Sequence, residues 1–236
     1  MATSADAGVI VVAAGRGARA ADGAAEPKQF RPIGGVPMLL RALRPFTSHP
    51  RIGSIVVALP PADAAAPPVW LRPFLSDRLG VVAGGQTRQD SVANALARLP
   101  ADAKVVLVHD AARPFVDADL IDRVLAVAVL GACAIPAVPL ADTVKETDTA
   151  GLVVRTVPRE RLVAVQTPQG FPRAMLETAH QRARSEPAAE ATDDAALCER
   201  LGYPVRVVAG SARNLKVTTA EDFAVAEALA LAEGRP

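Results

Sequence analysis

The sequence predicts an α/β fold in which a mostly parallel sheet carries helices on both faces. Short apolar runs rich in Val, Ile and Leu alternate along the chain with amphipathic segments, the order of strands and helices in such folds. The runs are apolar throughout, as expected for strands buried on both faces. Of the 236 residues 50% are apolar, which is enough to bury a core without disulfides or metals, and we predict a single domain over 1–236.

The apolar runs are predicted to be strands, and the amphipathic segments are predicted to be helices. The strands are Val9–Ala13, Ser54–Leu59, Leu79–Ala83, Val105–His109, Ala132–Val138 and Val205–Val208. The helices are Pro37–Phe46, Gln89–Leu99, Asp119–Leu130 and Ala220–Ala232. Because parallel sheets bind ligands at the carboxyl ends of their strands, the loops that follow Ala13, Ala83 and His109 are expected to gather at one rim.

The segment before the last helix, "NLKVT" at 214–218, is predicted to be a further strand. Thr218 and Glu221 have the spacing of a capping box, so the helix is expected to begin there. The helix itself is expected to serve packing.

Residues 139–166 break this rhythm and are predicted to form a β-hairpin arm. The segment "PLADTVKETDTAGLVVRTVPRERLVAVQ" alternates polar and apolar residues, with a turn signal at Thr149–Gly151. Its β-branched apolar residues need a surface to cover them, and a second subunit in a two-fold dimer provides one. The alternative is an arm that folds back on its own domain.

Composition argues against nucleic-acid and membrane partners. The net charge is +1 and aromatic residues make up 3%, which leaves neither a broad basic surface nor base-stacking platforms. The charge-free run 124–141 contains Gly131 and two prolines, so it predicts a buried helix and then a buried strand, not a bilayer span. Cys133 and Cys198 are expected to be buried thiols in a reducing compartment. The N-terminus lacks a signal-peptide pattern, and we expect a cytoplasmic protein.

The stretch 13–30, "AAGRGARAADGAAEPKQF", is the first candidate binding loop. Its glycine spacing matches a dinucleotide-binding turn, but that fingerprint also expects an acidic residue about 20 positions later. Around position 35 the sequence is "PIGGVPML", without an acid. A triphosphate fits better, since Gly15 and Gly17 allow close approach of the backbone while Arg19 and Lys28 supply positive charge.

Two later loops add candidate ligands. In "GGQTRQDSV" (84–92), Gly85 ends a strand and Ser91 lies near a helix start, where it either caps the helix or helps to hold a base. In "HDAARP" (109–114), Asp110 ends a strand, and a carboxylate there suits Mg²⁺ bridged to phosphates. Arg113 is expected to brace this loop by pairing with a carboxylate, and His109 to be a packed residue rather than a base.

The motifs occur in one order along the chain. They are "AAGRGARA…EPKQF", "GGQTRQDSVANAL" (84–96), "VHDAARPFV" (108–116), "ADTVKETD" (141–148), "TVPRERL" (156–162), "QTPQGF" (166–171), "ATDDAAL" (191–197) and "NLKVT" (214–218). Together they resemble the 2-C-methyl-D-erythritol 4-phosphate cytidylyltransferase family of the non-mevalonate isoprenoid pathway, from about residue 8 to 228. The resemblance implies a Rossmann-like fold of the nucleotidyltransferase type, with the arm serving dimerisation.

The resemblance also implies roles for individual residues. Arg19 and Lys28 would stabilise the transition state, Lys216 would lie near the α-phosphate and the acceptor, and Arg159 would bind the acceptor phosphate in the neighbouring subunit's site. The residues implied in CTP binding are Ala13, Ala14, Gly15, Gly17, Gly85, Ser91 and Asp110, with Asp110 also holding Mg²⁺. Those implied in binding the polyol phosphate are Thr143, Arg159, Thr167, Thr192 and Lys216.

The implied reaction is attack of a phosphate-monoester oxygen on the α-phosphorus of CTP, with pyrophosphate leaving. The nucleophile is already ionised at neutral pH, so the reaction needs cations and positioning rather than a general base. Alternatives are a cytidylyltransferase that uses ribitol 5-phosphate, a transferase that uses UTP with a sugar 1-phosphate, and a non-catalytic nucleotide-binding protein of the same fold. The loop 16–27 is expected to be mobile without nucleotide.

Overall fold

The structure, a computed structural model, describes residues 6–15, 27–185 and 191–234. Its strands are β1 (Ala7–Val12), β2 (Pro32–Ile33), β3 (Val36–Pro37), β4 (Ile52–Leu59), β5 (Leu79–Ala83), β6 (Val105–Asp110), β7 (Cys133–Pro139), β8 (Val144–Thr147), β9 (Val153–Val157), β10 (Val163–Val165), β11 (Gln169–Pro172) and β12 (Val205–Ala209). Its helices are α1 (Met38–Ser48), α2 (Pro61–Ala65), α3 (Arg88–Arg98), α4 (Ala118–Ala128), α5 (Arg173–Ser185), α6 (Asp194–Arg200) and α7 (Ala220–Ala232), with short 3-10 turns η1 (Lys28–Phe30) and η2 (Arg72–Phe74).

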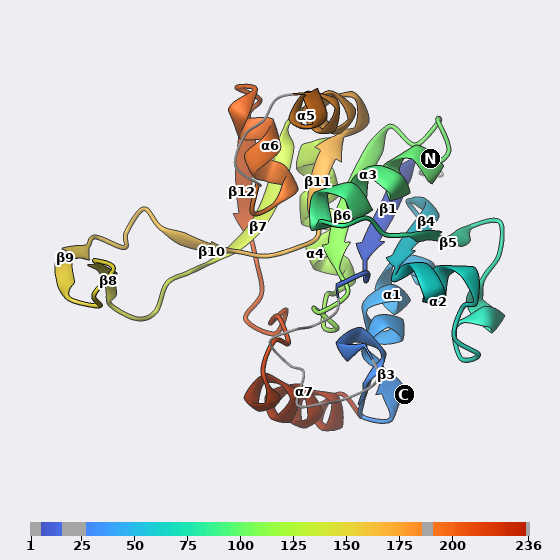
Figure 1. The fold of residues 1–236 in the computed structure, drawn as a ribbon, viewed down its shortest axis with the longest axis horizontal. Coiled ribbons are helices and arrows are strands. Elements are labelled where there is room, and N and C mark those ends of the chain that lie inside the picture. The colour runs from blue at the N-terminus through green and yellow to red at the C-terminus, as the bar shows by residue number, and fades with distance from the viewer. Residues whose placement is uncertain (1–5, 16–26, 186–190, 235–236) are drawn as a thin grey trace.

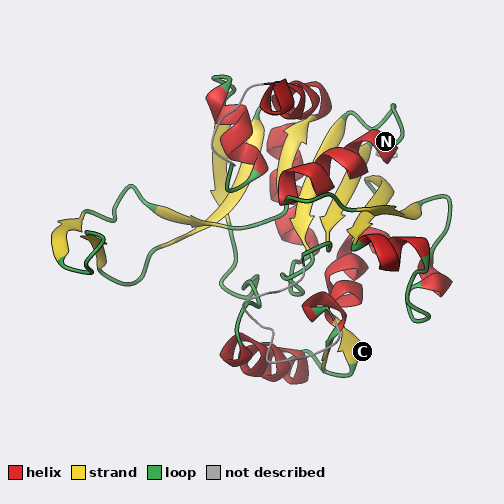
Figure 2. Cartoon of the chain, viewed as in Figure 1, coloured by secondary structure: helices red, strands yellow, loops and turns green. Residues whose placement is uncertain are grey.

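A twisted central sheet organises the molecule (Figures 1 and 2). The strand order is β10-β7-β11-β6-β1-β4-β5, and β12 pairs with β7. The pairs β1–β4, β1–β6, β4–β5 and β7–β12 are parallel, while β11 runs antiparallel between β6 and β7. The sheet is therefore mostly parallel, as the sequence predicts, with β11 as an antiparallel strand that the sequence analysis did not anticipate.

Helices cover both faces of the sheet because every second residue of a buried strand points to the opposite face. In β1, Val9 and Val11 pack in one core cluster with residues of α1 and α4. Ile10, between them, packs in the other cluster with residues of α3, α5 and α6. Both faces are apolar, which explains why the strands are uninterrupted apolar runs in the sequence.

The charge-free run 124–141 has the predicted interpretation. Helix α4 ends at Ala128, and Gly131 follows with a positive φ of 90°, a conformation that favours glycine at a helix end. Strand β7 then begins at Cys133 and lies inside the sheet. Among the described helices, none is long and apolar enough to cross a membrane.

The segment before α7 differs from the prediction. Residues 214–218 form no strand; instead Val217 N–H donates to Ala112 O at 2.8 Å, and Arg113 donates to Asn214 O at 2.8 Å, so a loop supplies the partners that a strand would supply. The capping box is also one residue later than predicted, because Thr219 caps α7 and pairs with Asp222.

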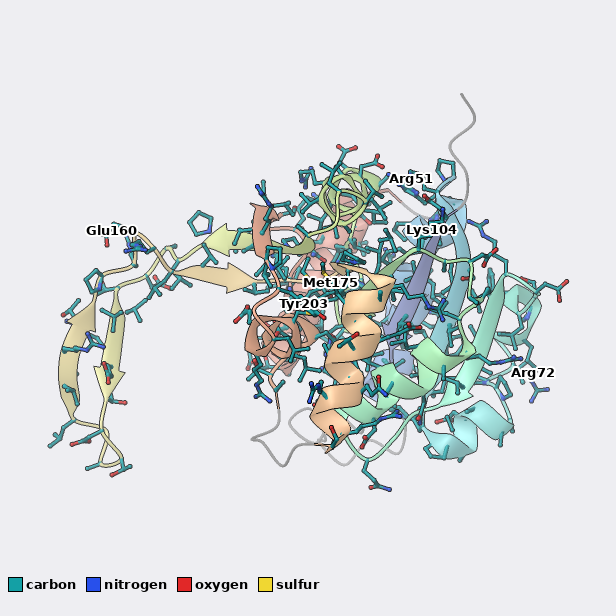
Figure 3. All side chains as sticks on the ribbon, turned by 90° about the horizontal axis from the view of Figure 1, so that it is seen from above. Arg51, Arg72, Lys104, Glu160, Met175 and Tyr203 are labelled. Atoms are coloured by element: carbon teal, nitrogen blue, oxygen red, sulfur yellow. The ribbon has the colours of Figure 1, made fainter. Side chains whose placement is uncertain are left out.

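We call residues 139–166 the arm. Its β10 pairs with β7 in the central sheet, and the part between these two strands extends away from the sheet (Figure 1). Strands β8 and β9 pair antiparallel as a separate two-stranded sheet, and Glu160 lies out on the same extension (Figure 3). Leu152, Val153 and Val154 are exposed on it, with Val154 at 61%. These apolar side chains lack the cover that helices give the central sheet. An isolated two-stranded ribbon is only marginally stable in water, so a covering surface would stabilise it. Dimerisation through the arm stays a prediction.

Candidate functional site

A cavity of about 270 Å³ opens at the carboxyl ends of β1, β5 and β6. The loops after these three strands meet there, which is the arrangement expected from a parallel sheet. Its described lining residues are Val12, Ala13, Ala14, Gly15, Lys28, Gln29, Gly85, Gln86, Thr87, Arg88, Ser91, Asp110, Ala111, Ala112 and Lys216.

Two glycines after β5 allow close packing at the rim: Gly84 lies against the loop after β1, and Gly85 lies against the start of α3. A Cβ at Gly84 would lie 2.2 Å from the Cβ of Ala14, and a Cβ at Gly85 would lie 2.2 Å from the Cβ of Asp90. Both positions therefore exclude any side chain. Gly84 N–H also donates to Leu59 O at 2.8 Å, which holds the loop against the end of β4.

The start of α3 fixes the loop that follows. Thr87 is the N-cap and forms a capping box with Asp90. Ser91 is not the cap: its hydroxyl lies one turn further on, donates to Thr87 O at 2.9 Å and accepts Gly85 N–H at 3.1 Å. The Ser91 hydroxyl therefore shapes the loop from inside the helix, and its predicted contact with a nucleotide stays a prediction.

Asp110 lies between two cations at the end of β6. Arg88 Nε is 3.3 Å from one carboxylate oxygen, and Lys216 Nζ is 2.8 Å from the other. Burial alone would raise the pKa of Asp110, but the charges of Arg88 and Lys216 outweigh it and hold that pKa well below its usual range. The carboxylate is therefore ionised at neutral pH.

Arg88 is a residue that the sequence analysis quoted within a motif but did not single out. Its Nη1 donates to Asp194 at 2.6 Å, and Asp194 in turn accepts from His180 Nε2 at 2.9 Å. Burial opposes the charge on Arg88, yet the Asp194 and Asp110 carboxylates hold its pKa above the usual value. The sequence does carry one signal for Arg88, since it directly follows the N-cap of a helix that begins after a glycine-containing loop. Asp194 comes from α6, and only the fold brings it near Arg88.

His109 and Thr167 lie directly behind Asp110. The Thr167 hydroxyl accepts Asp110 N–H at 3.0 Å and contacts His109 Nδ1 at 3.1 Å, while His109 Nε2 contacts Arg113 O at 3.1 Å. This pattern is satisfied when Thr167 donates to Nδ1 and Nε2 donates to the carbonyl, so His109 is neutral. Burial lowers the pKa of His109 to about 4. It is a packed residue, as predicted.

Arg113 braces its loop, but through partners other than the predicted carboxylate. Its guanidinium donates to Asn214 O at 2.8 Å and to Val165 O at 3.2 Å. It thereby ties the loop after β6 to the segment that carries Lys216. Two backbone carbonyl oxygens, one from a turn and one from β10, thus take the place of the expected acid.

Lys28 is placed by a short 3-10 turn. Its Nζ donates to Val217 O at 2.6 Å, and the neighbouring Gln29 side chain donates to Ala13 O at 2.5 Å. These contacts tie the end of the first loop to β1 and to the Lys216 segment. Gly17 and Arg19 lie outside the described residues. Of the segment 16–27, which is expected to be mobile, the structure describes Pro27 alone, so that expectation stays a prediction.

The structure does not bring every predicted residue to the cavity. Thr143 and Arg159 are exposed on the arm, where Arg159 donates to Ala141 O. Thr192 is exposed just before α6. Thr167 is buried behind Asp110 with its hydroxyl already engaged. Their proposed contacts with an acceptor stay predictions.

The described part of the cavity offers a cation one acidic residue. Asp110 is the only acid among the described residues that line it, and the described residues contain no group of three or more His, Cys, Asp or Glu placed to hold a metal. One carboxylate fits Mg²⁺, which usually keeps waters and takes few protein ligands when phosphates supply the rest. It does not fit a metal that needs a full protein cage.

Comparisons with known proteins identify the relatives of this chain. Residues 7–231 match the family model of IspD, 2-C-methyl-D-erythritol 4-phosphate cytidylyltransferase. A bifunctional enzyme IspD/IspF of Chelativorans is 43% identical over 220 residues, covering 93% of this chain and 54% of that protein. The corresponding bifunctional enzyme of Nitratidesulfovibrio vulgaris is 47% identical over 228 residues, covering 93% and 57%.

Solved structures agree with these matches. The crystal structure of 2-C-methyl-D-erythritol 4-phosphate cytidylyltransferase from Thermus thermophilus is 40% identical and superposes with a TM-score of 0.80, covering 96% of this chain and 99% of that one. The structure of the bifunctional IspDF from Campylobacter jejuni superposes with a TM-score of 0.74 at 27% identity, covering 92% and 53%. The chain spans about half the length of the curated relatives it matches.

Proposed function

The chain belongs to the 2-C-methyl-D-erythritol 4-phosphate cytidylyltransferase family, and we propose that it transfers the cytidylyl group of CTP to 2-C-methyl-D-erythritol 4-phosphate. The products would be 4-diphosphocytidyl-2-C-methyl-D-erythritol and pyrophosphate. The observation that carries the proposal is the charge of the cavity: its described lining contains Lys28, Arg88 and Lys216 and one acid, Asp110.

Such a lining suits a polyanion. Lys28 and Lys216 can offset part of the charge of a triphosphate, whereas the charge of Arg88 is already met by Asp110 and Asp194. At Gly15 a Cβ would meet nothing within 4 Å, so the loop after β1 leaves space for phosphates to approach the backbone. Apolar Val12 and Ala13 on the same wall leave room for the less polar part of a nucleotide.

The proposed reaction is a displacement at phosphorus that needs no general base. A phosphate oxygen of the acceptor forms a bond to the α-phosphorus of CTP, the bond from that phosphorus to the oxygen bridging to the β-phosphate breaks, and the electron pair leaves on pyrophosphate. The attacking phosphate is largely deprotonated at neutral pH, because its second pKa is about 6. Lys28 and Lys216, with the predicted Arg19, would hold the two anions together and stabilise the charge of the transition state.

Mg²⁺ is the cation that we propose for this site, with Asp110 as its protein ligand. The ion would neutralise phosphate charge. Asp110 is already ionised beside Arg88 and Lys216, so it can bind a cation without losing a proton. Lys216 is 46% exposed and can turn from the carboxylate toward phosphates.

The acceptor half of the site is proposed to form between two subunits. Thr143 and Arg159 lie on the arm and do not line the cavity of their own chain. Exposed apolar residues on the same arm would be stabilised by a surface that covers them. A homodimer in which each arm reaches the partner's cavity would satisfy both needs. The expected cytoplasmic location also stays a prediction.

Pyrophosphate release with CTP and Mg²⁺ tests the proposal. Methylerythritol 4-phosphate should support release many-fold faster than ribitol 5-phosphate at equal concentration. The reverse preference would support the mechanism but show that the predicted acceptor is wrong, which would direct attention to the acceptor residues Thr143, Arg159 and Thr192. Release with neither acceptor would favour the non-catalytic nucleotide-binding alternative.

A further inference from the structure

The two cations beside Asp110 are held in very different ways. Lys216 lies on a segment without regular structure and is 46% exposed. Arg88 is the first residue of α3, directly after the N-cap Thr87, so the capping box fixes the backbone from which its side chain starts. Lys216 is therefore less constrained than Arg88.

The far end of Arg88 is anchored on a buried carboxylate. The side chain of Asp194 is 1% exposed, accepts Arg88 Nη1 at 2.6 Å on one oxygen and His180 Nε2 at 2.9 Å on the other. Asp194 begins α6, and Gln169 on β11 holds this helix start through Asp193 and Ala195 N–H. The anchor is thus tied to two helices and a central strand.

Arginine is suited to this position by its shape. The guanidinium is a planar fork whose Nε and Nη1 point in fixed, different directions, here to Asp110 and to Asp194. A lysine ammonium carries the same charge on one atom at the end of a flexible chain. It cannot hold two carboxylates at a set separation.

We propose that Arg88 is a positioning residue that keeps the Asp110 carboxylate in place once Lys216 has turned to the substrate phosphates, with Asp194 and His180 fixing Arg88 from behind. The inference rests on the proposed function, because it needs Lys216 to exchange partners when nucleotide and acceptor bind. Arg88 touches no reacting atom in this scheme and acts through Asp110.

The kinetic test compares Arg88→Gln with Arg88→Lys, Asp194→Asn and the control Arg98→Gln, an exposed arginine on the same helix α3. Since misplacing a catalytic group by about 1 Å can cost up to about 100-fold, Arg88→Gln should lower kcat by at least about tenfold, with KM for CTP changed less than about threefold. Arg88→Lys should restore part of kcat, and Asp194→Asn should lower it less than Arg88→Gln does. Arg98→Gln should behave as wild type. A large rise in KM for CTP at unchanged kcat would overturn the inference, because Arg88 would then be a direct nucleotide ligand.

A double-mutant cycle separates positioning from a merely structural role. If Arg88 acts through Asp110, Arg88→Gln should change kcat less than about threefold in an Asp110→Asn background. Multiplying effects would overturn the inference.

A crystal structure of Arg88→Gln, with and without CTP, gives a readout that needs no activity. The Asp110 side chain should leave its wild-type position in the CTP complex, and an unmoved carboxylate would overturn the inference. If Arg88→Gln does not fold, the Asp194→Asn crystals answer the same question, with displacement of Arg88 and Asp110 as the expected result. Wild-type protein that releases no pyrophosphate would instead refute the proposed function, while the position of Asp110 in the variant still decides the inference.

Discussion

The cavity and the arm are two regions with opposite construction. Around the cavity, Asp110 has two cationic partners, and Arg88 pairs with both Asp110 and Asp194. Close glycine contacts and a capping box hold the loops in place. On the arm, Val153 and Val154 are exposed and Arg159 meets only a backbone carbonyl of its own arm among the contacts described. The described cavity residues are therefore held by partners within one chain, whereas the described arm residues have few partners in their own chain.

The contrast has a physical reason. The cavity residues sit at the ends of buried parallel strands, so packing on both faces of the sheet fixes them. On the arm, β8 and β9 form a two-stranded sheet of their own, so their geometry depends on what covers them. Changes at the cavity should therefore affect chemistry and stability within each chain, and changes on the arm should affect acceptor binding and assembly.

Replacing Lys28 should give the largest effect. Lys28→Ala should lower kcat by about 100- to 1000-fold, the cost of removing one group that stabilises transition-state charge. Steady-state pyrophosphate release measures it. Lys104→Ala, an exposed lysine outside the cavity lining (labelled in Figure 3), is the matched control and should be unaffected. Equal activity of both variants would contradict the assignment of the cavity as the catalytic site.

His109 should make the stability of the folded protein sensitive to acid. In the unfolded chain it takes up a proton near pH 6.5, but in the folded protein its pKa is about 4 because it is buried. The unfolded state therefore binds more protons between these values, and stability should fall as pH drops from 6.5 to 4. The loss from this residue approaches about 3 kcal/mol, at about 1.4 kcal/mol per pKa unit.

Urea unfolding at several pH values measures this effect. His109→Gln keeps a donor and an acceptor without the titration, so its stability should depend less steeply on pH across that window. Parallel pH profiles for the two proteins would show that His109 takes up its proton equally in both states.

Arg159 should separate the two halves of the site. Arg159→Ala should raise KM for the acceptor by about 10- to 100-fold, the loss of one charge-assisted phosphate contact of about 1.5 to 3 kcal/mol, and leave KM for CTP unchanged. Arg161→Ala on the same arm is the control. A parallel rise in both KM values would place Arg159 with the nucleotide.

Mixed dimers sharpen the same point. When the acceptor concentration is far below the KM of Arg159→Ala, that protein and Lys28→Ala should each have low activity. Refolded together they should regain part of it, because some sites would then combine an intact arm with an intact cavity. No recovery would count against a site shared between subunits.

Gly84→Ala should show how tightly the cavity loops pack. The added methyl group would meet the Ala14 Cβ at 2.2 Å, so the loops must move apart, and we expect a loss of about 1 to 3 kcal/mol in the free energy of unfolding. Gly80→Ala on β5, where a Cβ meets nothing within 4 Å, should be near neutral. Equal stability of the two variants, measured by urea unfolding, would mean that the contact between the loops is not maintained in solution.

Val154→Glu should have the smallest effect on the stability of the single chain and should act through assembly. Placing a charge in an apolar interface should weaken the predicted dimer by about tenfold or more, without lowering the melting temperature of the monomer. Sedimentation equilibrium at micromolar concentration measures the dissociation constant, and Val69→Glu, exposed on the body, is the control. A wild-type protein that is monomeric at these concentrations would remove the dimer and favour an arm that acts alone.

The sequence by itself determined the sheet and most of the cavity. Strand runs such as Val105–His109 could be identified because burial on both faces demands uninterrupted apolar residues, and the loops that follow them must then share a rim. Glycines and charged residues in those loops, Gly85, Lys28 and Asp110 among them, predict a phosphate site, and the structure brings these three to one cavity. These features depend on local composition and on the order of elements.

Only the tertiary structure decided which charges meet. Arg88, Asp194 and His180 come from three helices, and no local pattern indicates that α5 and α6 bring a buried carboxylate behind the first residue of α3. The antiparallel insertion of β11 and the use of a loop to pair residues 214–218 are likewise long-range choices. Local sequence sets backbone preference and burial, whereas the pairing of distant polar groups is fixed by the packing of whole elements.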